Sequence, residues 1–196
     1  MISVFYILLA LTVLAMIIAI AWRFASRRYM IPCPVWMSGL LDTPHATGMS
    51  ARTQQTIQHL DLRAGMNVLD AGCGPGRLTI PVAHIVGPSG EVTAMDLQEG
   101  MLREAKERAH AANLTNIRFL LSGIGEIPER DAALREIFVA LKLGGILLVE
   151  ETIRDPHFQT RSTVVQLACA AGFIEKEFSG NFFSYTLTLE KPSDAL

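Results

Sequence analysis

The sequence predicts an α/β fold: a doubly wound, mostly parallel sheet with a C-terminal antiparallel hairpin, preceded by one transmembrane helix. Three observations support this prediction. Apolar strands and amphipathic helices alternate from residue 50 onward. Two neighbouring apolar runs, 173–178 and 183–189, are typical of a terminal strand pair. Residues 2–22 carry no charge and are rich in leucine, isoleucine, alanine and valine.

The uncharged run at residues 2–22 is long enough to cross a bilayer as a helix, which takes about 20 residues. Three arginines follow it within residues 23–28, so the positive-inside rule places the rest of the chain in the cytoplasm. A cleaved signal peptide is the alternative, because residues 19–21 resemble a cleavage site, but its apolar core is only about 7–15 residues long. A buried core helix is disfavoured because the run is apolar on every face. We expect a membrane anchor at residues 1–22.

Residues 23–49 are expected to connect this anchor to a single domain at residues 50–196. Tyr29 and Trp36 suit the membrane–water interface, although an ordinary linker explains them equally well. The net charge is −2, and no basic run with interleaved aromatic residues occurs, so we expect no nucleic-acid partner. The three cysteines and five histidines lack the spacing of metal ligands, so we expect no metal site.

Within the domain, the periodicity predicts helices and strands in alternation. Ser50 is expected to cap the first helix, which ends near Leu60. The other expected elements are a strand ending at Asp70, a helix at 78–85, a strand at 91–96, a helix at 99–112, a strand at 117–121, a helix at 130–143, a central parallel strand at 146–149, a helix at 161–171 and the two terminal strands.

The strongest functional signal lies at residues 66–76. Asp70 ends a strand there, and glycines then follow at the alternate positions 72, 74 and 76 before a helix begins. Glycine lets the backbone turn tightly and approach a ligand, because no Cβ stands in the way. The helix adds unpaired N–H groups and the positive end of its dipole. We therefore expect a nucleotide-type pocket at the carboxyl end of a parallel sheet.

The spacing of these glycines narrows the choice of cofactor. A dinucleotide fingerprint counted from Gly72 requires glycine at the position of Arg77, which disfavours a nucleotide-dependent oxidoreductase. Asp96 ends the next strand, where a carboxylate can accept hydrogen bonds from two ribose hydroxyls. A purely structural glycine turn in another α/β protein is the alternative.

The chain resembles the class I, Rossmann-like methyltransferases that depend on S-adenosylmethionine (SAM), from about residue 60 to residue 192. Their first motif, acid-x-G-x-G-x-G, stands here as residues 70–76, and the second specific match is Asp96 followed by Leu97. The resemblance implies SAM as the cofactor. It places Asp70 near the methionine moiety, the backbones of Gly72, Cys73, Gly74 and Gly76 against the cofactor, Asp96 on the ribose and Leu97 against the adenine.

A membrane-tethered methyltransferase suits a small or lipid-like methyl acceptor, such as a quinone precursor or a phospholipid headgroup, or a membrane protein. Because the protein mainly positions the two partners in methyl transfer, no catalytic residue is assigned. Candidates near the acceptor are Glu126, the pair Glu150 and Glu151, and the pair Asp155 and His157. The preferred interpretation is an exposed residue beside a helix for Glu126, a solvated pair for Glu150 and Glu151, and no catalytic role for Asp155 and His157. Cys73 is expected to be a small side chain that fits the loop rather than a reactive thiol.

The middle of the chain departs from the family pattern. The family has a third strand, a loop, a helix and a fourth strand where this chain has only residues 116–128, and a second parallel strand needs a crossover of at least about ten residues. We expect residues 117–121 to lie directly beside the first strand, in the fourth strand's place. The family's adenine-binding acid belongs to the missing loop. A SAM-binding or interaction module without catalysis is therefore the alternative function.

Overall fold

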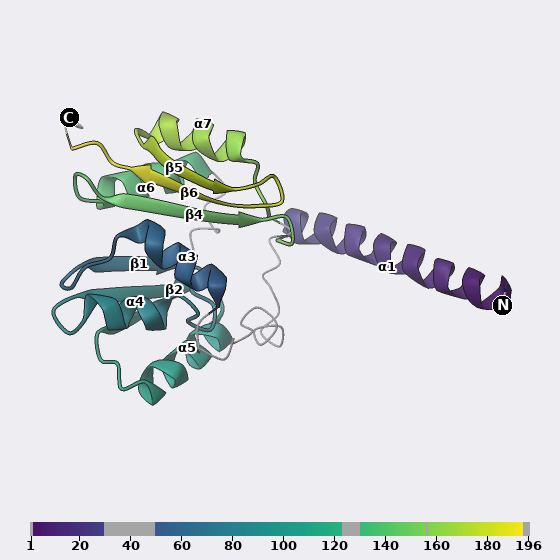
Figure 1. Cartoon of the computed structure of the whole chain (residues 1–196), viewed down its shortest axis with the longest axis horizontal. Helices are drawn as coiled ribbons and strands as arrows, with labels where there is room; N and C mark the ends of the chain where they lie inside the picture. The colour runs from purple at the N-terminus through teal and green to yellow at the C-terminus, as the bar shows by residue number, and fades with distance from the viewer. Residues whose placement is uncertain (1, 30–49, 123–129, 156, 194–196) are drawn as a thin grey trace.

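The computed structural model describes residues 2–29, 50–122, 130–155 and 157–193. Its N-terminal helix, α1 (Ile2–Tyr29), projects away from the rest of the chain (Figure 1). Residues Val4–Ser26 of α1 are long and apolar enough to cross a membrane, by length and composition. A signal sequence meets the same criteria, so the single-pass anchor stays a prediction.

The remaining helices and strands follow the predicted alternation, and Ser50 caps the first of them as predicted, its Oγ accepting the N–H of Thr53 at 3.1 Å. Two bounds differ by three residues, since the helix predicted at 130–143 ends at Ala140 and the strand predicted at 146–149 continues to Thr152. The other predicted bounds differ by at most two residues. The elements are α3 (Ala51–Leu60), β1 (Asn67–Ala71), α4 (Thr79–Val86), β2 (Glu91–Asp96), α5 (Glu99–Ala111), β3 (Ile117–Leu121), α6 (Arg130–Ala140), β4 (Ile146–Thr152), α7 (Arg161–Ala171), β5 (Ile174–Gly180) and β6 (Ser184–Glu190).

The first three strands form a parallel sheet in the order β1-β2-β3. Its central strand, β2, buries Val92 and Ala94 completely. The prediction that residues 117–121 lie directly beside the first strand is wrong, because β3 pairs with β2 and occupies the outer edge. The side chain of Asn116 holds the start of β3 there, donating to two carbonyl oxygens at the end of α4 at 2.9 and 2.8 Å.

Helices α4 and α5 pack on this sheet through their apolar faces. The stripe predicted on α5 is confirmed, since all four of its side chains are buried: Met101, Leu102, Ala105 and Ala109. Val82, Ala83 and Val86 of α4 pack against Val92 of β2. Helices α4 and α5 thus cover the sheet that carries the glycine motif at the end of β1.

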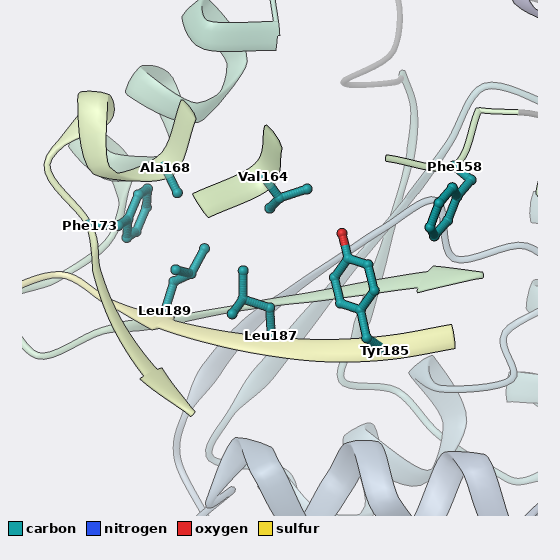
Figure 2. Close-up of a cluster of buried hydrophobic side chains, with 7 residues drawn as sticks. All are labelled: Phe158, Val164, Ala168, Phe173, Tyr185, Leu187 and Leu189. Atoms are coloured by element: carbon teal, nitrogen blue, oxygen red, sulfur yellow. The ribbon is translucent and has the colours of Figure 1, made fainter. Parts of the chain in front are cut away.

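The last three strands form a separate antiparallel sheet in the order β4-β6-β5. The predicted terminal hairpin is confirmed as β5 and β6. The prediction of a central parallel strand at 146–149 is wrong, because β4 pairs antiparallel with β6 and lies at the edge of the described sheet. Helix α7 packs on this sheet through the cluster shown in Figure 2: Phe158, Val164, Ala168, Phe173, Tyr185, Leu187 and Leu189.

The two sheets meet at β1 and β4 (Figure 1), and we call the region between these strands the seam. No described strand pairs with the outer edge of β1 or with the outer edge of β4. Residues 123–129, which hold part of the shortened middle segment, lie outside the described residues. Among the described residues, the sheets are therefore connected across the seam by side chains and by α3, which packs on β4.

Candidate functional site

The glycine loop, residues 72–77, follows β1 and needs glycine at three positions. Gly72, Gly74 and Gly76 have φ angles of +75°, +52° and +87°, where a side chain costs about 1–2 kcal/mol. A Cβ on Gly72 or Gly74 would meet nothing within 4 Å, so their backbone is open to a ligand. A Cβ on Gly76 would lie 3.3 Å from the Cβ of Ala105, so this glycine allows the loop to pack on α5.

Asp96 ends β2 and holds the tip of the glycine loop. Its Oδ2 accepts the N–H of Gly74 and its Oδ1 accepts the N–H of Gln98, both at 2.9 Å. A carboxylate offers about four lone-pair positions, so Asp96 retains acceptor capacity for two hydroxyl groups. Leu97, the next residue, is 40% exposed and presents an apolar surface beside it. The structure thus brings Asp96 and Leu97 to the loop, and their contacts with a cofactor stay predictions.

Asp70 lies at the foot of the same loop, where its Oδ2 accepts a hydrogen bond from the Thr79 hydroxyl at 2.6 Å. Burial raises the pKa of the Asp70 carboxyl above its ordinary value. The Thr79 hydroxyl and the charge of Arg77 oppose this rise, while the carboxylates of Asp96 and Glu150 add to it. Thr79 is fully buried at the start of α4 and was not among the predicted site residues.

A cluster of polar side chains, which we call the Glu150 cluster, crosses the seam. Its members are Arg52, Thr53, Thr56, Arg77 and Glu150. Arg77 Nη2 donates to Glu150 Oε2 at 3.1 Å, and Arg77 Nη1 donates to the Thr53 hydroxyl at 2.8 Å. Arg52 Nε lies 3.4 Å from the same Glu150 oxygen, and the Thr56 hydroxyl donates to the other one. The Glu150 side chain is only 16% exposed.

The interpretation of Glu150 and Glu151 as a solvated pair is therefore wrong. Glu150 belongs to the cluster across the seam, and Glu151 Oε2 accepts the N–H of Gln159 at 3.1 Å. Asp155 and His157 make a turn, in which the His157 backbone N–H donates to Asp155 Oδ1 at 2.7 Å, rather than a contact through the imidazole. Glu126, the remaining candidate, lies outside the described residues.

Cys73 is buried within the loop and packs with Ala94 and Leu102. Burial, with smaller effects from the charges of Asp70 and Asp96, raises the pKa of the Cys73 thiol to about 12. The thiol therefore stays protonated at neutral pH, and Cys73 acts as a small side chain that packs in the loop.

A cavity of about 270 Å³ lies between α3 and the β5–β6 hairpin. Arg52 of the Glu150 cluster lines it, together with Gln55 and Tyr185. The Tyr185 hydroxyl donates to the carbonyl of Gln159 at 2.9 Å. Among the described residues, no group of three or more histidine, cysteine or acidic side chains is arranged to hold a metal ion.

Sequence reasoning missed the other members of the Glu150 cluster. Two sequence features could have indicated them. Arg77 follows the third glycine directly, and Thr53 and Thr56 lie three residues apart on one face of α3. Their common partner, Glu150, stands 73 residues beyond Arg77 in the chain, so no local pattern links them.

Residues 62–133 match the family model of the methyltransferase domain. The UbiE ubiquinone/menaquinone biosynthesis C-methyltransferase of Shewanella woodyi is 31% identical over 122 residues, which cover 52% of this chain and 49% of that protein. The demethylmenaquinone methyltransferase of Listeria welshimeri is 29% identical over 116 residues, covering 59% and 49%.

Residues 62–133 thus resemble a methyltransferase domain, and the chain has the Rossmann-like fold of SAM-dependent methyltransferases. It spans about half the length of the curated relatives it matches. A SAM-dependent methyltransferase from Aquifex aeolicus has the same fold, with a TM-score of 0.69, 20% identity, and coverage of 82% of this chain and all of that one. The [4+2]-cyclase SpnF also shares the fold, at a TM-score of 0.60, 19% identity, and coverage of 77% and 84%. The fold alone therefore does not determine the reaction.

Within the matched residues, the glycine loop has the features that a SAM site requires. The backbone is open above Gly72 and Gly74, Asp96 keeps free acceptor positions, and Leu97 offers an apolar surface next to them. A nucleoside with a ribose and a flat base requires this combination of hydroxyl acceptor, close backbone and apolar contact.

Proposed function

We propose that this chain is a methyltransferase that α1 anchors to a membrane, with the domain on the cytoplasmic side and a small or lipid-like molecule as methyl acceptor. The observation that carries the proposal is the position of the Asp96 carboxylate beside the open backbone of Gly74. This pair occurs at the end of two adjacent parallel strands, within the residues that match the methyltransferase domain.

The residues of the loop would hold the cofactor as follows. Asp96 accepts hydrogen bonds from the ribose hydroxyls, the backbone of Gly72 and Gly74 approaches the cofactor, and Leu97 covers the adenine. When bound, SAM supplies an electrophilic methyl group on a positively charged sulfur. The protein's task is then to orient the acceptor and exclude water.

The choice of acceptor rests on location and on the relatives. Two of them are named for ubiquinone/menaquinone biosynthesis and for demethylmenaquinone, which are both quinone systems. The apolar span of α1 would hold the domain at the surface of the bilayer in which such acceptors dissolve. The three arginines directly after residue 22 favour the cytoplasmic side.

One observation favours a second candidate, a cofactor-binding module without turnover. No described strand closes the seam between β1 and β4, which borders the glycine loop. Only residues 116–128 stand where the family has a third strand, a loop, a helix and a fourth strand, and an acceptor misplaced by about 1 Å for want of these parts would react roughly a hundredfold more slowly.

The test is calorimetric titration of SAM into the full chain in detergent micelles. We expect micromolar binding, and we expect Asp96→Ala to weaken it at least about tenfold, the loss of one strong hydrogen-bonding group. Asp131→Ala is the matched control, because Asp131 is a surface acid on α6 that pairs with Arg135. Absence of binding by folded protein would contradict both candidate functions.

The two candidates are separated by turnover. Full chain in vesicles that contain a demethylated quinone is supplied with methyl-labelled SAM, and the label is followed into the lipid fraction. Transfer above that of Asp96→Ala supports the methyltransferase, whereas binding without transfer supports the module.

A further inference from the structure

The C-terminal end of α1 contacts the domain where β4 ends (Figure 1). Arg23 Nη1 donates to the carbonyl oxygens of Ile153 and Asp155, at 2.8 and 3.2 Å. Ser26, one turn further along, is fully buried. The apolar helix is therefore attached directly to the loop after β4, and not only through the connector that follows it.

The tip of the β5–β6 hairpin, residues 181–183, belongs to the same contact. The N–H of Ile153 donates to the carbonyl oxygen of Phe183 at 2.7 Å, so one residue links the tip to Arg23. The tip is itself ordered by Asn181, whose Oδ1 accepts the N–H groups of Phe183 and Ser184 at 2.9 and 3.2 Å. A fixed turn thus lies next to the point where α1 joins the domain.

This turn presents large apolar side chains to the outside. Phe182 and Phe183 are 65% and 62% exposed, with their rings edge to face and their centroids 5.5 Å apart. Ile153 adds an exposed side chain beside them. Tight turns normally carry glycine, proline, asparagine, aspartate or serine, and paired exposed phenylalanines in a turn indicate a surface that is covered by a partner.

The surroundings of the turn favour a bilayer as that partner. Arg154, next to Ile153, is exposed, and Arg28 of α1 stacks over the ring of Tyr29, which is also exposed. Arginines together with aromatic rings are typical of the headgroup level, where anionic lipids attract the charges and the rings enter the boundary.

We propose that Phe182, Phe183 and Ile153 insert into the headgroup boundary of the membrane that α1 crosses. This inference rests on the membrane anchoring in the proposed function. The insertion turns the carboxyl ends of β4 and β5 toward the bilayer. It also brings the cavity between α3 and the hairpin, which Ser184 and Tyr185 line directly after the tip, close to the lipid surface. A lipid-dissolved acceptor then reaches the domain without crossing water.

The proposal is tested by tryptophan quenching in vesicles with full-length chains that each hold a single tryptophan. The first keeps Trp22 and carries Trp36→Phe. The second and third carry Trp22→Phe and Trp36→Phe with either Phe183→Trp or Val139→Trp. Val139 is the matched control, because it is an exposed apolar residue near the end of α6, which leads to the opposite, amino end of β4.

The vesicles contain lipids brominated near the headgroup end of their acyl chains. We expect Trp22 and the tryptophan at 183 to lose roughly half of their emission, as suits rings about 5–10 Å below the headgroups, and the tryptophan at 139 to lose none. Quenching of Trp22 with no more quenching at 183 than at 139 would overturn the hairpin contact and leave the anchor intact. No quenching of Trp22 would overturn the anchoring and this proposal together. Neither result depends on methyl transfer, so failure of the enzymatic proposal is recognised separately.

Discussion

Arg77 Nη2 lies 3.1 Å from Glu150 Oε2 and joins the two sheets at a place where their described strands exchange no backbone hydrogen bonds. Arg77 comes from the glycine loop, and Glu150 comes from the second half of β4. The ion pair therefore ties the loop that is proposed to hold the cofactor to the half of the domain that contains the hairpin and the contact with α1. Its side chains are 23% and 16% exposed, so solvent screens it less than a surface pair.

Arg77→Met removes the charge and keeps most of the aliphatic stem. We expect it to lower the free energy of unfolding by about 1.5–3 kcal/mol, because Glu150 loses a charged hydrogen-bond partner in a poorly hydrated position. Urea unfolding in micelles, followed by circular dichroism, measures this loss. Arg135→Met is the control, since Arg135 pairs with Asp131 on the surface of α6 and such pairs contribute about 0.3–0.5 kcal/mol. Equal losses in the two variants would contradict a structural role for the pair across the seam.

Gly72→Ala is expected to separate cofactor binding from stability. A Cβ at Gly72 meets no neighbour, but φ is +75°, so the backbone strain costs about 1–2 kcal/mol. Gly144→Ala is matched, with φ of +71° and only an ordinary contact to the Ser193 hydroxyl. We expect similar melting temperatures for both variants. We expect SAM affinity to fall at least about tenfold for Gly72→Ala alone, because the added methyl group obstructs the approach of the cofactor to the backbone. Equal affinities would show that no ligand approaches Gly72.

Asp70→Asn is expected to stabilise the protein at neutral pH. The folded state raises the pKa of Asp70 above its ordinary value, so the folded state binds more protons than the unfolded one between the ordinary pKa and the raised pKa. Stability from this group is present at low pH and is lost as pH rises through the window. Asparagine carries no charge and still accepts the Thr79 hydroxyl. Thermal melts at several pH values should show a gain at pH 7 that vanishes toward pH 3.8; a constant difference would contradict the assignment.

The cysteines are expected to differ in reactivity. Because the pKa of Cys73 is about 12, its thiolate fraction at pH 7 is roughly a thousandfold below that of an ordinary thiol, whereas Cys169 is exposed on α7. Iodoacetamide labelling followed by peptide mass spectrometry should modify Cys169 before Cys73, and Cys73 only on unfolding. Rapid labelling of Cys73 in folded protein would show that the loop opens.

Local patterns were sufficient to predict β2 and β3, whose bounds match the predicted ranges 91–96 and 117–121, because each apolar run is bracketed by polar or turn residues. The partner of β3 was not predictable, because strand pairing depends on where α5 returns the chain and on the anchoring of Asn116. The shortened middle segment led to the prediction that residues 117–121 take the fourth strand's place beside β1. The chain instead pairs them with the preceding strand, β2, whose edge was free.

The candidate site also contains residues that could be predicted from the sequence and residues that could not. The glycines and Asp96 were recognisable because they are close in sequence to the strand ends that position them. The Glu150 cluster was not recognisable, since Arg77 and Glu150 become neighbours only when the two sheets assemble. Polar contacts between distant segments leave no periodic signal, so Glu150 read alone was indistinguishable from a solvated surface acid.

The seam also bears on how the domain unfolds. The cluster around Val82 and Val92 belongs to one sheet, and the cluster around Phe173 and Leu187 belongs to the other, so each sheet has a hydrophobic core of its own. Two cores joined by a polar cluster are expected to form two cooperative units with different amide-exchange protection. A cofactor that binds the glycine loop stabilises the unit containing β1 against unfolding. Because Arg77 pairs with Glu150, it also stabilises the unit containing Glu150. Cofactor binding would then make the two units unfold in one step instead of two. The contacts across the seam would transmit the stabilisation from the cofactor-binding unit to the other one.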